Sequence, residues 1–406
     1  MADFYDTFDI NKVVTLKYGT AKGCYFGCGA ISKFASICDD LKPSCVGFVC
    51  SKSAHVRSGA FPAIEKVLKE KSIPYLVYNK VVANPMTDSI DECTKLFREK
   101  YDDHFVVCTI GGGSPGDAGK SISVMLEYPE KTAEQLYRQQ FAPTKRAKLV
   151  MVNITSGTGT EVDMFAVASV SRSNPPIKPC IATATIYPDY SIDDPLLTKT
   201  TNEFQTRYTA IDAMNHVMEA CSTLVATPFS VTLGAQVSEL ITRYLPVALA
   251  HPDDVRARYW LMYAAAIAGM AFDESLLHLT HALEHTLSAY IPDLTHGLGL
   301  ALIQPGVMRH CWAKAGPVFV HCFPQILKGL TGKPEEAQQA FDLMRAWHIS
   351  VGQKETMATV GFKKEQLDEL VAAVDACPGM AGLIAIAPVA TSKEDIKAIF
   401  ASGFFD

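Results

Sequence analysis

Short apolar runs alternate with amphipathic segments along the first half of the chain. The runs are rich in β-branched residues and end in turn-forming residues, a pattern typical of buried strands. They are VGFVC (46–50), YLVYNKVV (75–82), FVVCTI (105–110) and LVMVNI (149–154). Between them apolar residues recur about every 3.6 positions, as in 61–71 and 88–100, which predicts helices. This alternation predicts a parallel sheet built from βα units.

After about residue 200 the pattern becomes helical. Long segments there have helical spacing with no clear strand pattern between them: 230–250, 255–272 and 335–351. The change falls near YPDYSIDDPLLTKTT (187–201), where Pro188 and Pro195 prevent a helix from crossing. We therefore predict two domains, an α/β parallel-sheet domain over 1–197 and an all-helical domain over 198–406.

Composition and charge narrow the class of function. A chain of 406 residues is long enough for two hydrophobic cores, and 48% hydrophobic with 20% charged residues is usual for a globular protein. The net charge is −6 and no stripe of Lys and Arg could follow a phosphate backbone, so we expect a small-molecule ligand and no nucleic acid. The N-terminal MADFYDTFDINKVV lacks the apolar core of a secretory signal, and no apolar run has the length of a membrane helix. We expect a cytoplasmic protein with no membrane partner.

The cysteines change this picture little. Twelve cysteines in a long chain without a signal sequence are expected to be reduced and buried. Cys24 and Cys28, in GCYFGCGA, could be two zinc ligands, but no second pair lies nearby, so we interpret both as core thiols.

Two glycine-rich turns follow two of the predicted strands. GGGSPGDAGKS begins at Gly111 directly after FVVCTI, and TSGTGTE begins at Thr155 directly after LVMVNI. Both turns leave the same edge of a parallel sheet, where doubly wound sheets bind their ligands. Gly111, Gly113 and Gly116 fit the spacing GxGxxG, which lets backbone N–H groups approach a pyrophosphate at a helix N-terminus.

The glycine pattern is not specific by itself. It follows a third or later strand, and no clear acid stands about 20 residues further on, where the usual dinucleotide fingerprint has one. A P-loop ending in Gly119, Lys120 and Ser121 would need glycine at Ser114, which disfavours a kinase or ATPase. Tight βα turns without any ligand are the alternative interpretation.

Ionisable residues gather in two helical segments of the second half. In TAIDAMNHVMEA, Asp212 and His216 are four residues apart, so one helix face presents both side chains. In LLHLTHALEHTLSAYIPDLTHGLG, three histidines share one helix face and a fourth follows a break: His278, His281, His285 and His296. A carboxylate with imidazoles suits Fe(II), Zn(II), Mn(II) or Co(II), which would polarise a carbonyl oxygen or stabilise an alkoxide. A lone histidine on an apolar face is usually a core residue, but the two motifs together favour a metal site.

These segments together resemble the iron-containing, or group III, alcohol dehydrogenases. The resemblance covers nearly the whole chain and rests on GGGSPGDAGK (111–120), TSGTGTEVD (155–163), DDPLLT (193–198), TAIDAMNHVMEA (209–220) and HALEHTLSAYIPDLTHGLGLA (281–301). It implies a Rossmann-like α/β domain followed by an all-helical domain, as predicted above. It also implies hydride transfer between NAD(P)(H) and a small alcohol or aldehyde, with one divalent metal, Fe(II) or Zn(II). A homodimer or larger homo-oligomer is expected.

The resemblance assigns roles to individual residues. The metal ligands would be Asp212, His216, His281 and His296, and His285 would relay protons beside the nicotinamide. The cofactor groove would be formed by Gly111, Gly112, Gly113, Ser114, Asp117, Thr155, Ser156, Thr158, Thr160 and Lys178. The candidates for the substrate pocket are Phe165, Phe272, His278 and Leu279.

Three departures from the family pattern bear on these roles. The interval from His281 to His296 is one residue longer, so the loop before His296 would differ in shape. Ile211 stands where glycine usually precedes the metal aspartate, although the Asp-to-His spacing is intact. In the first βα turn, CSKSAHVRSG, members that prefer NAD commonly carry an aspartate, whereas this chain has Lys52. A lysine attracts a 2′-phosphate, so NADP(H) is favoured over NAD(H).

Two rival functions use the same features. A metal-dependent lyase of the dehydroquinate synthase kind, which uses the nucleotide only transiently, needs basic residues for an anionic substrate. The metal segments show no obvious basic set around the ligands. A non-catalytic binding protein would not need the complete set of ligands. We therefore predict an NAD(P)-dependent aldehyde reductase, and the sequence does not choose among alkanols, diols, hydroxy acids and sulfonated aldehydes.

Overall fold

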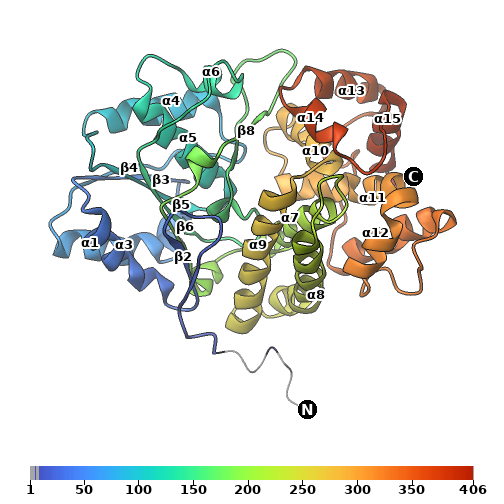
Figure 1. Ribbon diagram of the computed structural model, residues 1–406, viewed down its shortest axis with the longest axis horizontal. Helices are drawn as coiled ribbons and strands as arrows, with labels where there is room; N and C mark the ends of the chain where they lie inside the picture. Colours follow the sequence, from blue (N-terminus) through green and yellow to red (C-terminus); the bar gives the residue numbers. More distant parts are fainter. Residues whose placement is uncertain (1–4, 6–8, 406) are drawn as a thin grey trace.

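A seven-stranded sheet forms the centre of the N-terminal part in this computed structural model, which describes residues 5 and 9–405 (Figure 1). Its strand order is β1 (Val14–Leu16), β2 (Gly23–Phe26), β9 (Tyr190–Asp193), β6 (Lys148–Asn153), β5 (Val106–Gly111), β3 (Val46–Cys50) and β4 (Tyr75–Tyr78). All neighbours are parallel except β1 with β2. The prediction that the N-terminal segment is not a secretory signal concerns residues 1–14. Of these, residues 1–4 and 6–8 lie outside the part of the chain that the structure describes.

The four apolar runs form β3, β4, β5 and β6, as predicted, although β4 ends at Tyr78. The short strands β1, β2 and β9 were not predicted. β9 has the sequence YSID, and two polar residues in four hide the pattern of a buried strand. It lies inside the segment expected to separate two domains. The boundary after residue 197 falls in the short 3₁₀ helix Pro195–Thr198 that follows β9, and the division into two domains stays a prediction.

Helices cover both faces of the sheet (Figure 1). One face carries α1 (Phe34–Leu41), α2 (Ala54–Arg57) and α3 (Ala60–Glu70), and the other carries α4 (Thr87–Arg98), α5 (Gly113–Glu127) and α6 (Ala133–Tyr137). The chain order reverses between β3 and β5, because β4 pairs with one side of β3 and β5 with the other. The carboxyl ends of β3 and β5 therefore frame the crevice where such sheets bind ligands.

The C-terminal part is helical, as predicted. Its helices are α7 (Glu203–Ala220), α8 (Pro228–Ala250), α9 (Val255–Ser275), α10 (Leu279–Tyr290), α11 (His296–Cys322), α12 (Ala337–Ser350), α13 (Leu367–Ala376), α14 (Met380–Ala385) and α15 (Lys393–Ser402). α7 packs against α8, α9 and α11, so it is buried on nearly all sides. Side-chain caps start α7, α8 and α9, with Asn202 before α7, Thr227 before α8 and Asp254 before α9.

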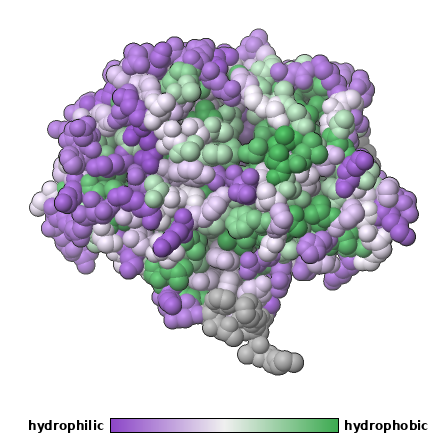
Figure 2. Space-filling view, viewed as in Figure 1, coloured by the Kyte–Doolittle hydropathy of each residue, from purple (hydrophilic) through white to green (hydrophobic). Residues whose placement is uncertain are grey.

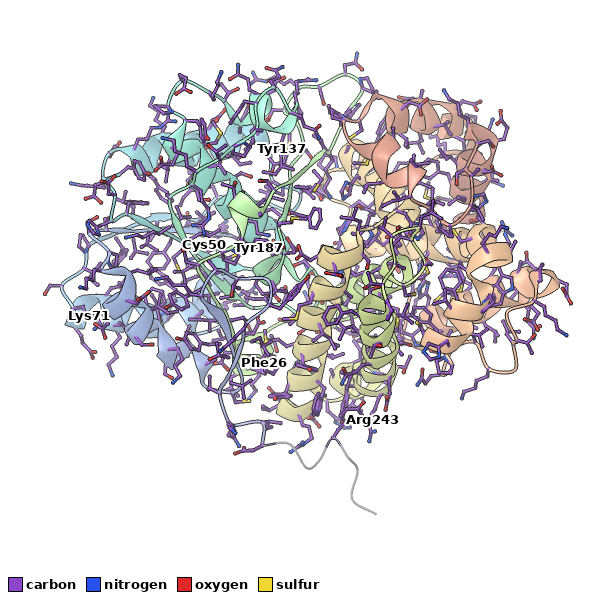
Figure 3. The ribbon with its side chains drawn as sticks, in the orientation of Figure 1. Phe26, Cys50, Lys71, Tyr137, Tyr187 and Arg243 are labelled. Carbon is purple, nitrogen blue, oxygen red and sulfur yellow. The ribbon has the colours of Figure 1, made fainter. Side chains whose placement is uncertain are left out.

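The sheet and the helices also meet directly. Figure 3 labels Phe26 of β2 where this strand approaches the helical part. The ring of Phe26 packs edge-on against Tyr259 and Tyr263 of α9, at centroid distances of 4.8 and 5.5 Å. All twelve cysteines are free thiols, and the Cys24 thiol donates to Asp193 Oδ2 at 3.4 Å. Among the described residues, no potential metal-binding group includes Cys24 or Cys28, and no helix has both the length and the apolarity to cross a bilayer.

Candidate metal and dinucleotide site

A cavity of about 1010 Å³ lies between the carboxyl edge of the sheet and the helical part. Its walls include both glycine turns, the start of α5, and residues of α7, α10 and α11. Most of the predicted site residues line it: Gly111, Gly112, Gly113, Ser114, Asp117, Thr155, Thr158, Thr160, Lys178, Asp212, His216, His281, His285 and His296. Four do not. Lys52 is exposed in the turn after β3, and Ser156 is buried within the second glycine turn. Of the candidates for the substrate pocket, Phe165 and Phe272 line the cavity, whereas His278 and Leu279 are buried outside its lining. Ser51 lines the cavity from the same turn as Lys52, and Arg57 lines it from α2.

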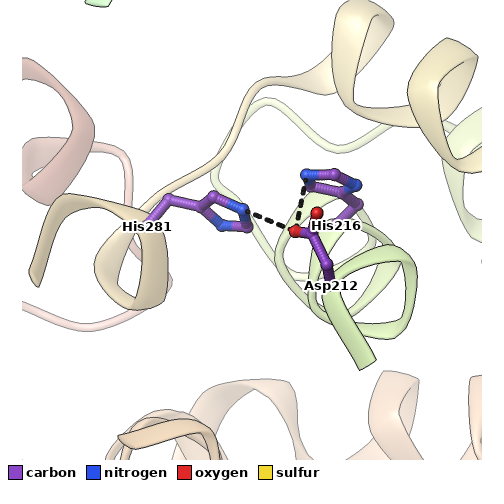
Figure 4. A group of neighbouring side chains, drawn as sticks. All are labelled: Asp212, His216 and His281. Carbon is purple, nitrogen blue, oxygen red and sulfur yellow. Dashed lines mark ion pairs between the residues drawn. The ribbon is translucent and has the colours of Figure 1, made fainter. Parts of the chain in front are cut away.

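Four side chains converge at the deep end of the cavity. Asp212 and His216 project from one face of α7, while His281 comes from α10 and His296 is the first residue of α11. The Nε2 atoms of the three histidines surround Asp212 Oδ1 at 3.3 Å (His216), 3.6 Å (His281) and 3.8 Å (His296). Figure 4 shows His216 and His281 directed at the carboxylate of Asp212 from two helices.

The cluster leaves buried polar atoms without partners. Asp212 Oδ1 and His281 Nε2 are both buried, and neither has a hydrogen-bond partner. Such orphaned atoms are costly unless a ligand satisfies them, and one carboxylate with three imidazoles is a donor set for a divalent cation. Burial lowers the pKa of His216 to about 3, which keeps its imidazole in the neutral form that binds metals. The residues present therefore fit a metal ion.

Two further carboxylates hold the histidines in place, and the sequence analysis missed both. Glu219 Oε2 accepts a hydrogen bond from His281 Nδ1, and Glu284 Oε2 accepts one from His296 Nδ1. In each case the bond leaves Nε2 free to face Asp212, as in carboxylate–histidine–metal arrangements. A sequence signal exists, because Glu219 lies two helical turns after Asp212 on the same face.

Glu219 is fully buried and yet ionised. Its Oε1 accepts backbone N–H groups at the start of α10, at 2.6 Å from Thr280, 3.2 Å from His278 and 3.4 Å from His281. Burial opposes the charge, but the interactions with His281 and His278 outweigh it and lower the pKa of Glu219 to about 2. The negative carboxylate at a helix N-terminus is also favoured by the helix dipole.

The two glycine turns fit closely against each other. A Cβ atom on Gly112 would lie 2.4 Å from Thr155 Oγ1, and one on Gly113 would lie 2.7 Å from Thr158 Cγ2. Only glycine permits this contact between the turns. α5 begins at Gly113, so its first N–H groups have no partners within the helix and are available to an anion.

Asp117 strengthens the same junction. Its carboxylate accepts hydrogen bonds from Thr160 Oγ1 at 2.7 Å and from the backbone N–H of Val167 at 3.0 Å. These bonds tie α5 to the second glycine turn and to β7 (Phe165–Val167), which pairs with β8 (Cys180–Ala182) in a small antiparallel sheet. Asp117 thus lines the cavity and also fixes its wall.

Lys178 joins the sheet side of the cavity to the metal side. Its Nζ donates to Asn84 Oδ1 at 2.7 Å and to Ser288 Oγ at 2.9 Å, and lies 3.9 Å from Glu284 Oε2. Asn84 Nδ2 in turn donates to carbonyl oxygens at 292 and 294, at 2.9 and 3.1 Å. The loop expected to differ from the family, just before His296, is therefore fastened to the N-terminal part.

His285 and His278, which were expected on one helix face, lie in different surroundings. His285 lines the cavity, with ring centroids 6.4 Å from His281 and 5.6 Å from His296, and its buried Nδ1 has no hydrogen-bond partner. The expectation that His278 shares this face was wrong. α10 begins one residue later, so His278 has non-helical backbone angles, and its Nε2 lies 2.9 Å from Ser222 Oγ.

A parallel sheet whose glycine turns face a buried carboxylate–histidine cluster defines a metal-dependent, dinucleotide-binding class of protein. The description "Iron-containing alcohol dehydrogenase" matches residues 21–195, and "Fe-containing alcohol dehydrogenase family, C-terminal" matches residues 206–404. The long-chain primary alcohol dehydrogenase AdhA of Thermoanaerobacter ethanolicus is 42% identical over 397 residues, covering 97% of this chain and 98% of that protein. The NADPH-dependent butanol dehydrogenase of Clostridium saccharobutylicum is 26% identical over 95% of this chain and 97% of its own length.

A solved structure agrees in fold. The NADH-dependent butanol dehydrogenase A of Thermotoga maritima has a TM-score of 0.84 at 24% identity, covering 97% of this chain and 99% of that one. The chain therefore belongs to the iron-containing alcohol dehydrogenase family. The predicted activity, NAD(P)-dependent oxidation and reduction of alcohols and aldehydes, is confirmed, and the comparisons give the lyase no support.

Proposed function

We propose that this enzyme interconverts primary alcohols and aldehydes with NADP(H), at a divalent metal held by Asp212, His216, His281 and His296. One observation carries the assignment of the ligands. Three imidazole Nε2 atoms lie within 3.8 Å of Asp212 Oδ1, in the cavity that also contains both glycine turns. The named activities of the relatives, a long-chain primary alcohol dehydrogenase and a butanol dehydrogenase, support primary alcohols as the substrate class.

The residues of the chain divide the work of hydride transfer. A metal ion at the four ligands supplies a Lewis acid that polarises the carbonyl group of the substrate. The first N–H groups of α5 bind the pyrophosphate of the cofactor. Phe165 and Phe272 line the cavity beside the metal ligands and exclude water from the reacting atoms. His285, whose Nδ1 has no protein partner, relays a proton to or from the substrate oxygen.

The preference for NADP(H) rests on the turn after β3. Lys52 is exposed there, and Arg57 lines the cavity from α2. No ion pair involves either side chain among the described residues, so both charges are available to a 2′-phosphate. No acid in this turn opposes them.

The experiment is steady-state kinetics of the metal-loaded enzyme. Protein loaded with Fe(II) or Zn(II) is assayed with butanal and either NADPH or NADH, following the absorbance of the reduced nicotinamide. We expect continuous oxidation of NADPH, and Asp212→Ala and His281→Ala should lose both bound metal and turnover. Turnover by a metal-free Asp212→Ala variant would refute the ligand assignment. A higher kcat/KM with NADH than with NADPH would refute the cofactor preference. Arg57→Ala should lower kcat/KM with NADPH and leave kcat/KM with NADH unchanged. The expected homo-oligomer is tested separately by sedimentation velocity.

A further inference from the structure

The metal end of the cavity has apolar walls. The ring of Phe272 lies 4.5 Å, centroid to centroid, from the ring of His216, and the ring of Phe165 lies 5.6 Å from that of Phe272. Leu276 and Leu277, where α9 ends, line the same cavity. A substrate with its oxygen at the metal ligands therefore places its carbon chain among aromatic and aliphatic side chains.

The apolar lining continues from the cavity to α14. Met380 and Leu383 of this helix line the cavity, and α14 packs against α10, the helix of His281. Leu383 is half-buried, with part of its side chain at the surface. The cavity thus has an apolar side that reaches solvent.

Beyond Leu383 the surface stays apolar across a second segment of the chain. The loop between α7 and α8 is fastened to the end of α14, because the backbone N–H of Leu224 and the hydroxyl of Thr223 donate to the carbonyl oxygen of Ile386, at 2.8 and 3.1 Å. Leu224 is 67% exposed and Val225 is 45% exposed. Figure 2 shows hydrophobic side chains gathered over this part of the molecule, where Figure 1 draws α10 and α14.

We call this surface the apolar shelf and define it by Leu224, Val225, Leu383, Ile384 and Ile386. Neither segment that forms it contains a charged residue, from 220 to 238 or from 376 to 392. Single exposed apolar residues are common, but an uncharged apolar surface that continues a ligand cavity indicates a binding role.

We propose that the apolar shelf binds the distal part of a long alkyl chain, so that the enzyme prefers long-chain primary alcohols and aldehydes to short ones. The proposal rests on the function proposed above and adds the substrate class. A methylene group that passes from water to an apolar surface gains enough free energy to raise kcat/KM about fourfold. We therefore expect kcat/KM to rise with each added methylene until the chain has crossed the shelf.

The test compares straight-chain aldehydes from butanal to dodecanal, each below its solubility limit in water, with the metal-loaded enzyme. The readout is the ratio of kcat/KM for dodecanal to that for butanal. Leu224→Asn and Leu383→Asn should each lower this ratio by about fivefold or more, which corresponds to losing the contact of one or two methylenes. Ile349→Asn is the matched control, because Ile349 is also exposed, at 55%, but lies on α12 and does not line the cavity. It should keep the ratio of the unmodified enzyme.

The outcomes separate the two proposals. Reduction of butanal as fast as dodecanal, or an unchanged ratio in both shelf variants, would overturn the alkyl-chain proposal while leaving the dehydrogenase assignment intact. Failure to reduce any aldehyde would overturn the proposed function itself. A changed sedimentation coefficient of Leu224→Asn with an unchanged ratio would mean that a second copy of the chain covers the shelf, which also overturns the proposal.

Discussion

Removing the charge of Glu219 should weaken metal binding although all four proposed metal ligands stay unchanged. In Glu219→Gln the amide keeps one acceptor oxygen and gains an NH₂ group. Glu219 accepts from His281 Nδ1 through one oxygen and from three backbone N–H groups through the other. Whichever way the amide is turned, its NH₂ group meets hydrogen-bond donors. His281 then loses either its fixed orientation or the negative charge that makes its Nε2 a stronger ligand.

The structure gives a magnitude for this effect. The pKa of Glu219 falls from 4.5 to about 2. This shift corresponds to about 3 kcal/mol of net favourable interaction with the charged form of Glu219. Removing such partners of metal-bound histidines typically lowers affinity by about 10- to 100-fold, or about 1.4–2.8 kcal/mol. We therefore expect the Kd for Zn(II) or Co(II) to rise by about 10- to 100-fold.

The assay is competition with a chromophoric chelator, carried out on folded protein with the melting temperature of the metal-free form measured in parallel. Glu203→Gln is the matched control, because it makes the same change on the same helix at an exposed side chain. A Kd equal to that of the unmodified protein would refute the reasoning. So would a lower melting temperature as the only change, since Glu219 would then act only on folding.

Three further predictions follow from buried contacts. Gly112→Ala should lower NADPH affinity at least about tenfold in a fluorescence titration, because its Cβ would lie 2.4 Å from Thr155 Oγ1, whereas Gly234→Ala, with its nearest contact at 3.5 Å, should not. Lys120→Met should lower the free energy of unfolding in urea by about 3–5 kcal/mol, because Lys120 Nζ donates to Asp163 Oδ1 at 2.6 Å with both side chains buried; an unchanged midpoint would contradict this. Burial raises the pKa of Asp193 from 3.8 to about 7. This carboxyl therefore contributes stability below about pH 4 that is lost as pH rises through about 7, and Asp193→Asn should flatten the unfolding free energy over that range.

Local patterns in the sequence predicted much of the fold. Strands β3, β5 and β6 and the long helices follow from the spacing of apolar residues, which reports the structure of consecutive residues. Strand β9 was not predicted because Ser191 and Asp193 are polar, although both are buried in the sheet. Their burial depends on neighbours distant in sequence, such as Asn153, whose Nδ2 donates to Asp193 Oδ1 at 3.0 Å.

Some features of the candidate site likewise follow from local sequence, and others depend on contacts between distant segments. The sequence alone determined the glycine turns after two parallel strands and the Asp212–His216 pair, because both depend on the geometry of one strand end or one helix. Only the tertiary structure decided that His278 turns away, that Glu219 and Glu284 orient the histidines, and that the loop after α7 continues the wall begun by α14. These contacts join helices far apart in the chain, and packing, not local spacing, determines which side chains meet.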